Sequence, residues 1–138
     1  MASTAPIGSF RDAIPNRSIL SGGLISQSTS VVTEPDAAKT FFNPVQGALH
    51  TVASTAAVTW TITDASAPLP YDLKIGEGFL FFIQNNDGAD AITVAVAGNV
   101  TAGAGTFTVP SARTRIFSLT RISNLVHQLN TLGVLTHG

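Results

Sequence analysis

An alternation of apolar and hydroxyl side chains constrains the fold of this chain more than any other feature. In the run Val58-Thr59-Trp60-Thr61-Ile62-Thr63 every second residue is apolar and the residues between are threonines. Successive side chains of a β-strand point to opposite faces, so the pattern predicts a strand with one apolar face and one hydroxyl face. Valine, threonine and isoleucine also favour strands, because a branched Cβ suits a pleated surface.

Further short strand-like runs follow along the chain, at a spacing of about 8–12 residues. The run 79–83 is apolar on both faces, as expected of a strand that is central to a sandwich or covered by a second subunit. Turn residues such as Asn85-Asn86-Asp87-Gly88 separate them, and Asn and Gly tolerate positive φ. No helical periodicity extends over ten residues or more, and no long repeat is evident. The pattern predicts an all-β domain of six to eight strands, a sandwich or small barrel. The runs lie at 79–83, 92–96, 106–109, 113–122, 125–129 and 132–135.

Residues 1–29 have a different composition from the rest. Pro6, Pro15 and the pair Gly22-Gly23 argue against a long helix. A solvated tail would be poor in large apolar residues, whereas this segment holds Ile7, Phe10, Ile14, Ile19, Leu20, Leu24 and Ile25. We expect an extended N-terminal arm over 1–29 that orders against another surface, followed by a β-sandwich domain over 30–138. The alternative is that the arm packs along its own domain.

The charge content is unusually low. Charged residues make up 11% of the chain and hydrophobic residues 44%, with a mean hydropathy of +0.32; about 25% charged residues is ordinary. A free monomer of this kind would expose apolar patches. The longest apolar run, 79–83, is far shorter than the roughly 20 residues of a membrane-spanning helix. The seven Lys and Arg residues are scattered and the net charge is −1, whereas a protein that binds nucleic acid normally has a clustered basic face. We therefore do not expect nucleic-acid binding. We expect burial against other proteins, with no nucleic acid and no membrane as partner.

No motif for catalysis or metal binding is present in the sequence. His50, His127 and His137 are isolated, without a spacing that would bring two imidazoles to one metal ion. There is no nucleophile elbow and no phosphate-binding loop. We expect each histidine to have a structural or surface role, and we expect no enzyme activity, no cofactor and no metal site.

Several runs carry a resemblance to a known class of viral proteins. They are IGEGFLFFIQNN at 75–86, AITV at 91–94, GTFTV at 105–109 and TRIFSLT at 114–120. The first is similar to the pattern G-[DE]-x-[FL]-x-F-x-I-x-N of small β-sandwich structural proteins of phages and other viruses. The resemblance covers roughly residues 56–130. It implies a jelly-roll-like antiparallel β-sandwich and a role in the virion, and it brings no catalytic residue.

Within that class, a single domain with an N-terminal arm resembles a bacteriophage capsid decoration (cement) protein. Such a protein binds the outside of the capsid and clamps neighbouring major capsid subunits. The expected location is the outer capsid surface of the virion, after synthesis in the host cytoplasm; no signal peptide is visible at the N-terminus. One alternative is a fibre or spike subunit, although no shaft sequence is present. A second is a carbohydrate-binding module, which would expose aromatic rings.

We expect two sets of contacts in the assembly. Phe41 and Phe42 are candidates for self-association into a dimer or trimer, which would also cover open strand edges. The alternative for this pair is an ordinary lid on the core. The residues expected to contact the capsid come from the arm and are Ile7, Phe10, Arg11, Ile14, Arg17, Ile19 and Leu20.

Overall fold

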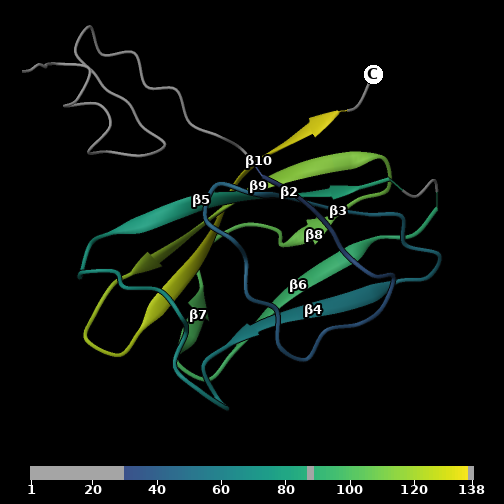
Figure 1. Ribbon diagram of the computed structural model, residues 1–138. Helices are drawn as coiled ribbons and strands as arrows, with labels where there is room; N and C mark the ends of the chain where they lie inside the picture. Colours follow the sequence, from purple (N-terminus) through teal and green to yellow (C-terminus); the bar gives the residue numbers. More distant parts are fainter. Residues whose placement is uncertain (1–29, 87–88, 137–138) are drawn as a thin grey trace, which may run out of the picture.

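The computed structural model describes residues 30–86 and 89–136, and this part of the chain folds into nine β-strands (Figure 1). It contains no helix in the described residues. The predicted arm, 1–29, lies outside them. The strands are β2 (Val31–Thr33), β3 (Leu49–Val52), β4 (Val58–Thr63), β5 (Gly78–Asn85), β6 (Ile92–Ala97), β7 (Val100–Ala102), β8 (Thr108–Val109), β9 (Arg113–Arg121) and β10 (His127–Thr136).

The strands form two sheets that face one another as the layers of a sandwich (Figure 1). The larger sheet has six strands in the order β2-β3-β5-β9-β10-β7, and the smaller has three in the order β4-β6-β8. The prediction of an all-β sandwich is therefore confirmed. The count exceeds the predicted six to eight because the predicted runs do not include β2, β3 and β7, which have only three or four residues each, too few to show a clear period of two. The predicted runs 125–129 and 132–135 form the single strand β10.

The expectation of uniformly antiparallel sheets is wrong, because four strand pairs are parallel. From β3 to β9 the chain passes from one sheet to the other at every connection. Two successive crossings bring the chain back in its original direction, so β3 pairs with β5, and β4 with β6, in parallel. A direct hairpin gives an antiparallel pair instead, as between β9 and β10.

The core lies between the two sheets. Trp60 and Ile62 of β4 are fully buried whereas Thr59 is exposed, as their alternation predicts. Within the six-stranded sheet, Phe81 of β5 is the cross-strand partner of Phe117 of β9, and their buried rings stack with centroids 5.3 Å apart. Burying one such side chain stabilises the fold by about 1.5–3 kcal/mol. These rings belong to one buried hydrophobic cluster with Trp60 and Ile62 of the smaller sheet, and this shared cluster holds the two layers together.

Candidate functional site

The outer face of the six-stranded sheet is the side turned away from the three-stranded sheet. Cross-strand register places one row of residues across five of its strands: Val31, Leu49, Phe82, Ile116 and Gly133. Their chain neighbours, such as Phe81 and Phe117, point to the core on the opposite side. Four large apolar side chains therefore line up on the outside of the sandwich.

No charged side chain stands among the strand positions that form this outer face in the described residues. The arginines of β9 point the other way; Arg115, for example, donates from Nε to the carbonyl of Thr108 in the opposite sheet, at 2.7 Å. The exposed fractions of Leu80 and Leu135 are 45% and 52%, so the face presents large apolar groups to solvent. Besides the row above, the face carries Thr33, Thr51, Leu80, Gln84, Thr114, Ser118, Thr120, Gln128, Asn130 and Leu135.

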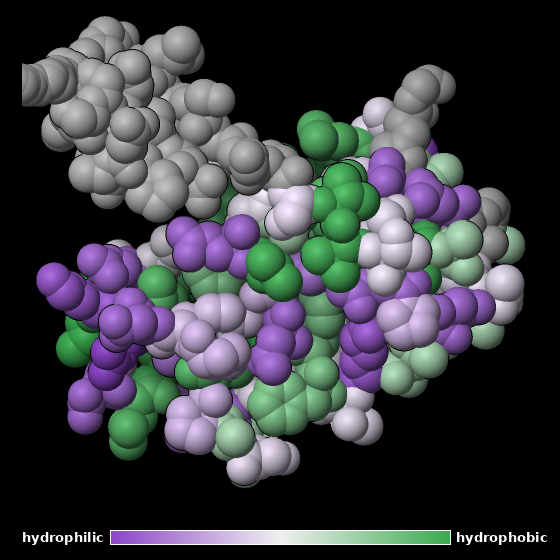
Figure 2. All heavy atoms as spheres, in the orientation of Figure 1, coloured by the Kyte–Doolittle hydropathy of each residue, from purple (hydrophilic) through white to green (hydrophobic). Residues whose placement is uncertain are grey.

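Such a surface has the composition of a protein interface. The fully buried centres of protein–protein interfaces are depleted in charge and more apolar than the surface at large. Figure 2 shows hydrophobic side chains along the upper side of the molecule, where Figure 1 places β2, β5 and β9. We therefore treat the outer face as the candidate docking surface.

A second feature is the segment 34–47, which we call the strap; it connects β2 to β3. The strap runs alongside the edge of β4. The amide of Lys39 donates to the carbonyl of Thr59 at 3.0 Å, Thr61 donates back to Lys39 at 2.8 Å, and Phe42 donates to Thr61 at 2.6 Å. These bonds satisfy part of the free edge of the smaller sheet.

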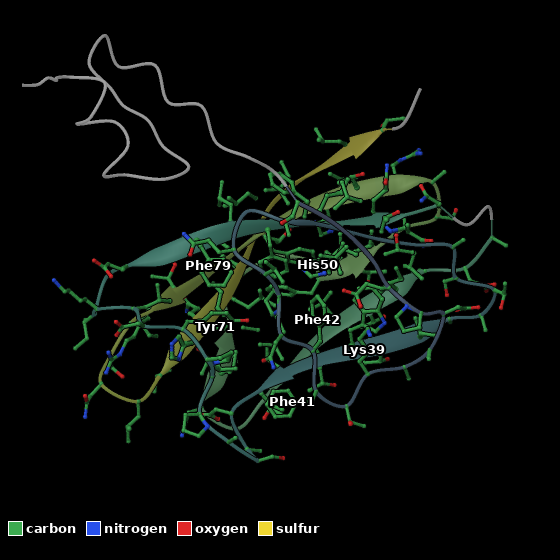
Figure 3. The ribbon with its side chains drawn as sticks, in the orientation of Figure 1. Lys39, Phe41, Phe42, His50, Tyr71 and Phe79 are labelled. Atoms are coloured by element: carbon green, nitrogen blue, oxygen red, sulfur yellow. The ribbon has the colours of Figure 1, made fainter. Side chains whose placement is uncertain are left out.

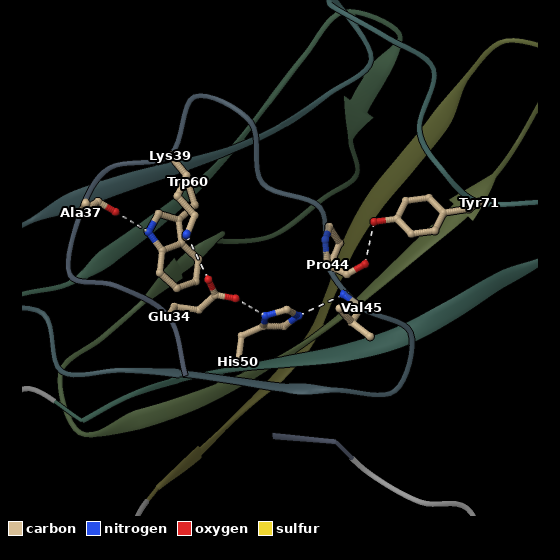
Figure 4. Close-up of polar contacts among 8 residues, drawn as sticks. All are labelled: Glu34, Ala37, Lys39, Pro44, Val45, His50, Trp60 and Tyr71. Carbon is tan, nitrogen blue, oxygen red and sulfur yellow. Dashed lines mark hydrogen bonds and ion pairs between the residues drawn. The ribbon is translucent and has the colours of Figure 1, made fainter. Parts of the chain in front are cut away.

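Side chains from three parts of the chain anchor the strap (Figure 4). Tyr71 donates its hydroxyl to the carbonyl of Pro44 at 2.6 Å, and Trp60 donates Nε1–H to the carbonyl of Ala37 at 3.0 Å. Burial raises the pKa of the Tyr71 phenol, which keeps it protonated as a donor. The strap is thus held at both ends against the core.

Between these anchors, His50 is buried and has its two ring nitrogens in fixed roles. The amide of Val45 donates to Nε2 at 3.0 Å, so Nε2 carries no proton. The proton therefore resides on Nδ1, which donates to Oε2 of Glu34 at 2.6 Å. Burial lowers the pKa of His50, and this outweighs the opposite effect of Glu34. The imidazole is neutral and joins the strap to β3.

Glu34 also forms an ion pair with Lys39, whose Nζ lies 3.0 Å from Oε1 of Glu34. Burial raises the pKa of the Glu34 carboxyl, but the hydrogen bonds from His50 and Lys39 lower it by more. The same Nζ lies 5.5 Å from the centre of the Trp60 ring. The charged pair is therefore part of the anchoring of the strap.

The strap contains Phe41 and Phe42, the two aromatic residues predicted to self-associate, and it places them differently. Phe42 is 3% exposed, with its ring centroid 4.9 Å from that of Trp60 and 5.0 Å from that of His50. Phe42 therefore does not lie between two copies of the chain, because its side chain is part of the chain's own core. This agrees with the alternative interpretation, in which Phe42 is a lid on the core. Phe41 is half-buried and points away from the core (Figure 3), so its role between copies stays a prediction.

A pocket of about 350 Å³ opens at the end of the sandwich where β4 and β9 finish and β10 begins. We call it the end pocket. It brings together the connection from β4 to β5 and the turn from β9 to β10. Its lining consists of Asp64, Pro68, Tyr71, Arg121, Asn124, Leu125 and His127.

Sequence reasoning found neither the strap nor the end pocket. His50 and His127 stand alone in the sequence, whereas the fold places His50 on Glu34 and brings His127 into the same pocket as Asp64. Local spacing carries no signal for partners 16 or more residues away. The capsid contacts predicted for Ile7, Phe10, Arg11, Ile14, Arg17, Ile19 and Leu20 fall outside the described residues.

Within residues 30–86 and 89–136 there is no group of three or more His, Asp or Glu side chains placed to hold a metal ion. The same residues contain no helix able to cross a membrane. No family model, no curated protein and no solved structure matches this chain.

Proposed function

We propose that this chain is a structural virion protein that binds the outside of a phage capsid and clamps neighbouring major capsid subunits. One observation supports the proposal most: at the strand positions that the structure describes, the outer face of the six-stranded sheet is a broad surface without a charged side chain. A protein that worked alone in solution would carry charges there to prevent association. The low charge of the whole chain points in the same direction.

The occupant of the outer face, in this proposal, is a second copy of the chain. Two identical uncharged faces meet without burying an unpaired charge, which is the costliest event at an interface. The central row of Val31, Leu49, Phe82 and Ile116 supplies apolar contact area. The flanking Thr, Ser, Gln and Asn side chains carry both donors and acceptors, so they pair with one another across a two-fold axis.

The arm then makes the contact to the shell. Its predicted capsid contacts, from Ile7 to Leu20, precede β2 in the sequence, and β2 is an edge strand of the same sheet. A pair of copies joined at the outer face carries two arms and so reaches two shell subunits. A clamp of this kind stabilises the shell in proportion to how much better it binds assembled than loose subunits.

The test is binding to purified expanded capsids that lack the protein. We expect saturable co-sedimentation and higher heat resistance of the particles, both weakened by removal of residues 1–29. Leu80→Glu places a charge on the outer face and should weaken capsid binding by about tenfold or more, since pairing of two arms is lost. Ile75→Glu is the matched control, because Ile75 is 61% exposed and lies outside the outer face.

Equal binding by Leu80→Glu and Ile75→Glu would remove the role of the outer face. No binding of the unmodified chain to any capsid would overturn the decoration function itself.

A further inference from the structure

The end pocket has the architecture of a binding site for a small molecule. Its volume of about 350 Å³ falls within the range of such sites, about 300–1,000 Å³. It lies between two connections and not on the outer face of the six-stranded sheet, so any ligand there is separate from the docking surface. The question is which ligand chemistry its walls suit.

Arg121 holds the walls together. Its Nη1 donates to the carbonyl of Leu73 at 2.7 Å, its Nη2 donates to the carbonyl of Asn124 at 2.7 Å, and its Nε donates to the carbonyl of Ser123 at 3.3 Å. The guanidinium therefore ties the β9–β10 turn to the β4–β5 connection. Because its donors are engaged with backbone carbonyls, it does not offer the open fork that captures a phosphate or carboxylate.

His127 is the group in the pocket that lacks a partner. Both Nδ1 and Nε2 are buried from solvent and make no hydrogen bond. Buried polar atoms are nearly always hydrogen-bonded, so an imidazole with two unsatisfied nitrogens calls for a partner. In its neutral form the ring supplies one donor and one acceptor. Burial, together with the positive charge of Arg121, lowers the pKa of His127 and favours that neutral form.

Asp64 adds an acceptor on the other wall. Its Oδ1 accepts the amide of Asn99 at 2.7 Å, which fixes the carboxylate in the wall of the pocket. The negative charge of Asp64 and the positive charge of Arg121 balance. With His127 neutral, the pocket as a whole has no net charge.

The rim of the pocket is apolar. Leu125 is 66% exposed, Pro68 is exposed beside it, and the ring of Tyr71 is half-buried with its hydroxyl already bound to Pro44. A ligand that fits both parts has hydroxyl groups that donate and accept hydrogen bonds, and an apolar C–H face that rests against the apolar side chains of the rim.

The geometry points to a neutral saccharide as the ligand of the end pocket, with its hydroxyl groups bound to His127 and Asp64 and its C–H face against Pro68 and Leu125. A strongly charged ligand does not suit the balanced pocket. This inference is independent of the decoration function, because it uses none of the residues of the outer face.

The test is a titration of the full ¹⁵N-labelled chain with a panel of neutral sugars, namely glucose, galactose, mannose, N-acetylglucosamine, maltose and lactose, each followed by amide chemical shifts. We expect at least one sugar to give saturable shifts at Asn124, Leu125 and His127. Glucuronate and glucose 6-phosphate serve as charged comparators and should bind more weakly. Absence of saturable shifts with every sugar in the panel overturns the inference, as does tighter binding of either charged comparator.

Two variants test the assigned contacts. His127→Leu keeps a side chain of similar reach without the ring nitrogens, and Asp64→Asn keeps an acceptor for Asn99 without the charge. Each should weaken binding of the sugar by about tenfold. Asp72→Asn is the matched control for Asp64→Asn, since Asp72 is exposed and does not line the pocket. If His127→Leu does not fold, Asp64→Asn decides the outcome, and unchanged affinity in a folded variant overturns the inference.

Discussion

Nδ1 of His50 and Oε2 of Glu34 lie 2.6 Å apart, and this contact links the middle of β3 to the start of the strap. The other nitrogen of the same ring receives the amide of Val45, near the end of the strap. One neutral imidazole therefore fixes both ends of a 14-residue segment. Protonation of this imidazole, or its removal by substitution, should lower the free energy of unfolding of the whole domain.

Stability should fall as the pH drops below neutrality. Burial lowers the pKa of folded His50 from its usual 6.5, so below that pH the unfolded chain binds a proton that the folded chain does not. Hydrogen bonds from His50 and Lys39 outweigh burial and lower the pKa of Glu34 from 4.5, so its contribution is present above pH 4.5 and is lost below it. The free energy of unfolding should decrease first below about pH 6.5 and again below about pH 4.5.

The measurement is urea denaturation at a series of pH values. His127 also has a lowered pKa and contributes in the same direction, so a variant is needed to separate the two. His50→Leu should be less stable than the unmodified chain near pH 7.5 and should lose less stability between about pH 7.5 and about pH 5.5. An equal pH dependence in both proteins would show that His50 does not titrate as inferred.

Phe42→Ala should destabilise the monomer severely. The side chain is 3% exposed and packs on Trp60 and His50, and truncation of a buried phenylalanine costs about 3–5 kcal/mol. Phe41→Ala, at the neighbouring half-buried position, should cost about 1 kcal/mol. Denaturant unfolding followed by Trp60 fluorescence gives both values. If Phe42→Ala instead leaves monomer stability intact and weakens self-association, the placement of Phe42 in the core is wrong.

Gly98→Ala should damage both the fold and the end pocket. Gly98 has φ of +67°, where an L-residue with a Cβ is strained by about 1–2 kcal/mol. A Cβ there would also collide with Oδ1 of Asp64, the carboxylate on the pocket wall. We expect a loss of more than about 1 kcal/mol in unfolding free energy and weaker sugar binding. Ala104→Gly, a loop change outside the pocket lining, is a control that should leave sugar binding unaltered.

Self-association through the outer face should be insensitive to salt. Raising NaCl from about 0.01 M to about 1 M shortens the Debye length from about 30 Å to about 3 Å, which weakens interfaces held by exposed charges. An interface formed by uncharged side chains such as Leu80 and Phe82 should keep its dissociation constant or tighten. Sedimentation equilibrium at both salt concentrations measures this. Dissociation at high salt would assign the contact to charged residues elsewhere.

The period of two along the chain determined the local structure. The alternation at 58–63 predicted β4 and the burial of Trp60 and Ile62, and the alternation at 92–96 predicted β6 in the same way. A continuous apolar run at 79–83 predicted β5, and a less regular alternation at 113–122 predicted β9. The predicted lack of helices in this region was also confirmed for the described residues. These features follow from the sequence because the face on which a side chain lies depends on its immediate neighbours in the strand.

Which strands become neighbours was decided by the tertiary structure. Nothing in the local pattern shows that β3 and β5 pair in parallel while β4 crosses to the other sheet. The contact of His50 with Glu34 depends on the parallel pairing of β3 with β2, and the pocket lined by Asp64 and His127 depends on the crossings between the sheets. Sequence spacing records contacts within a strand or turn, whereas contacts between distant segments come from the way the two layers bury their shared apolar faces.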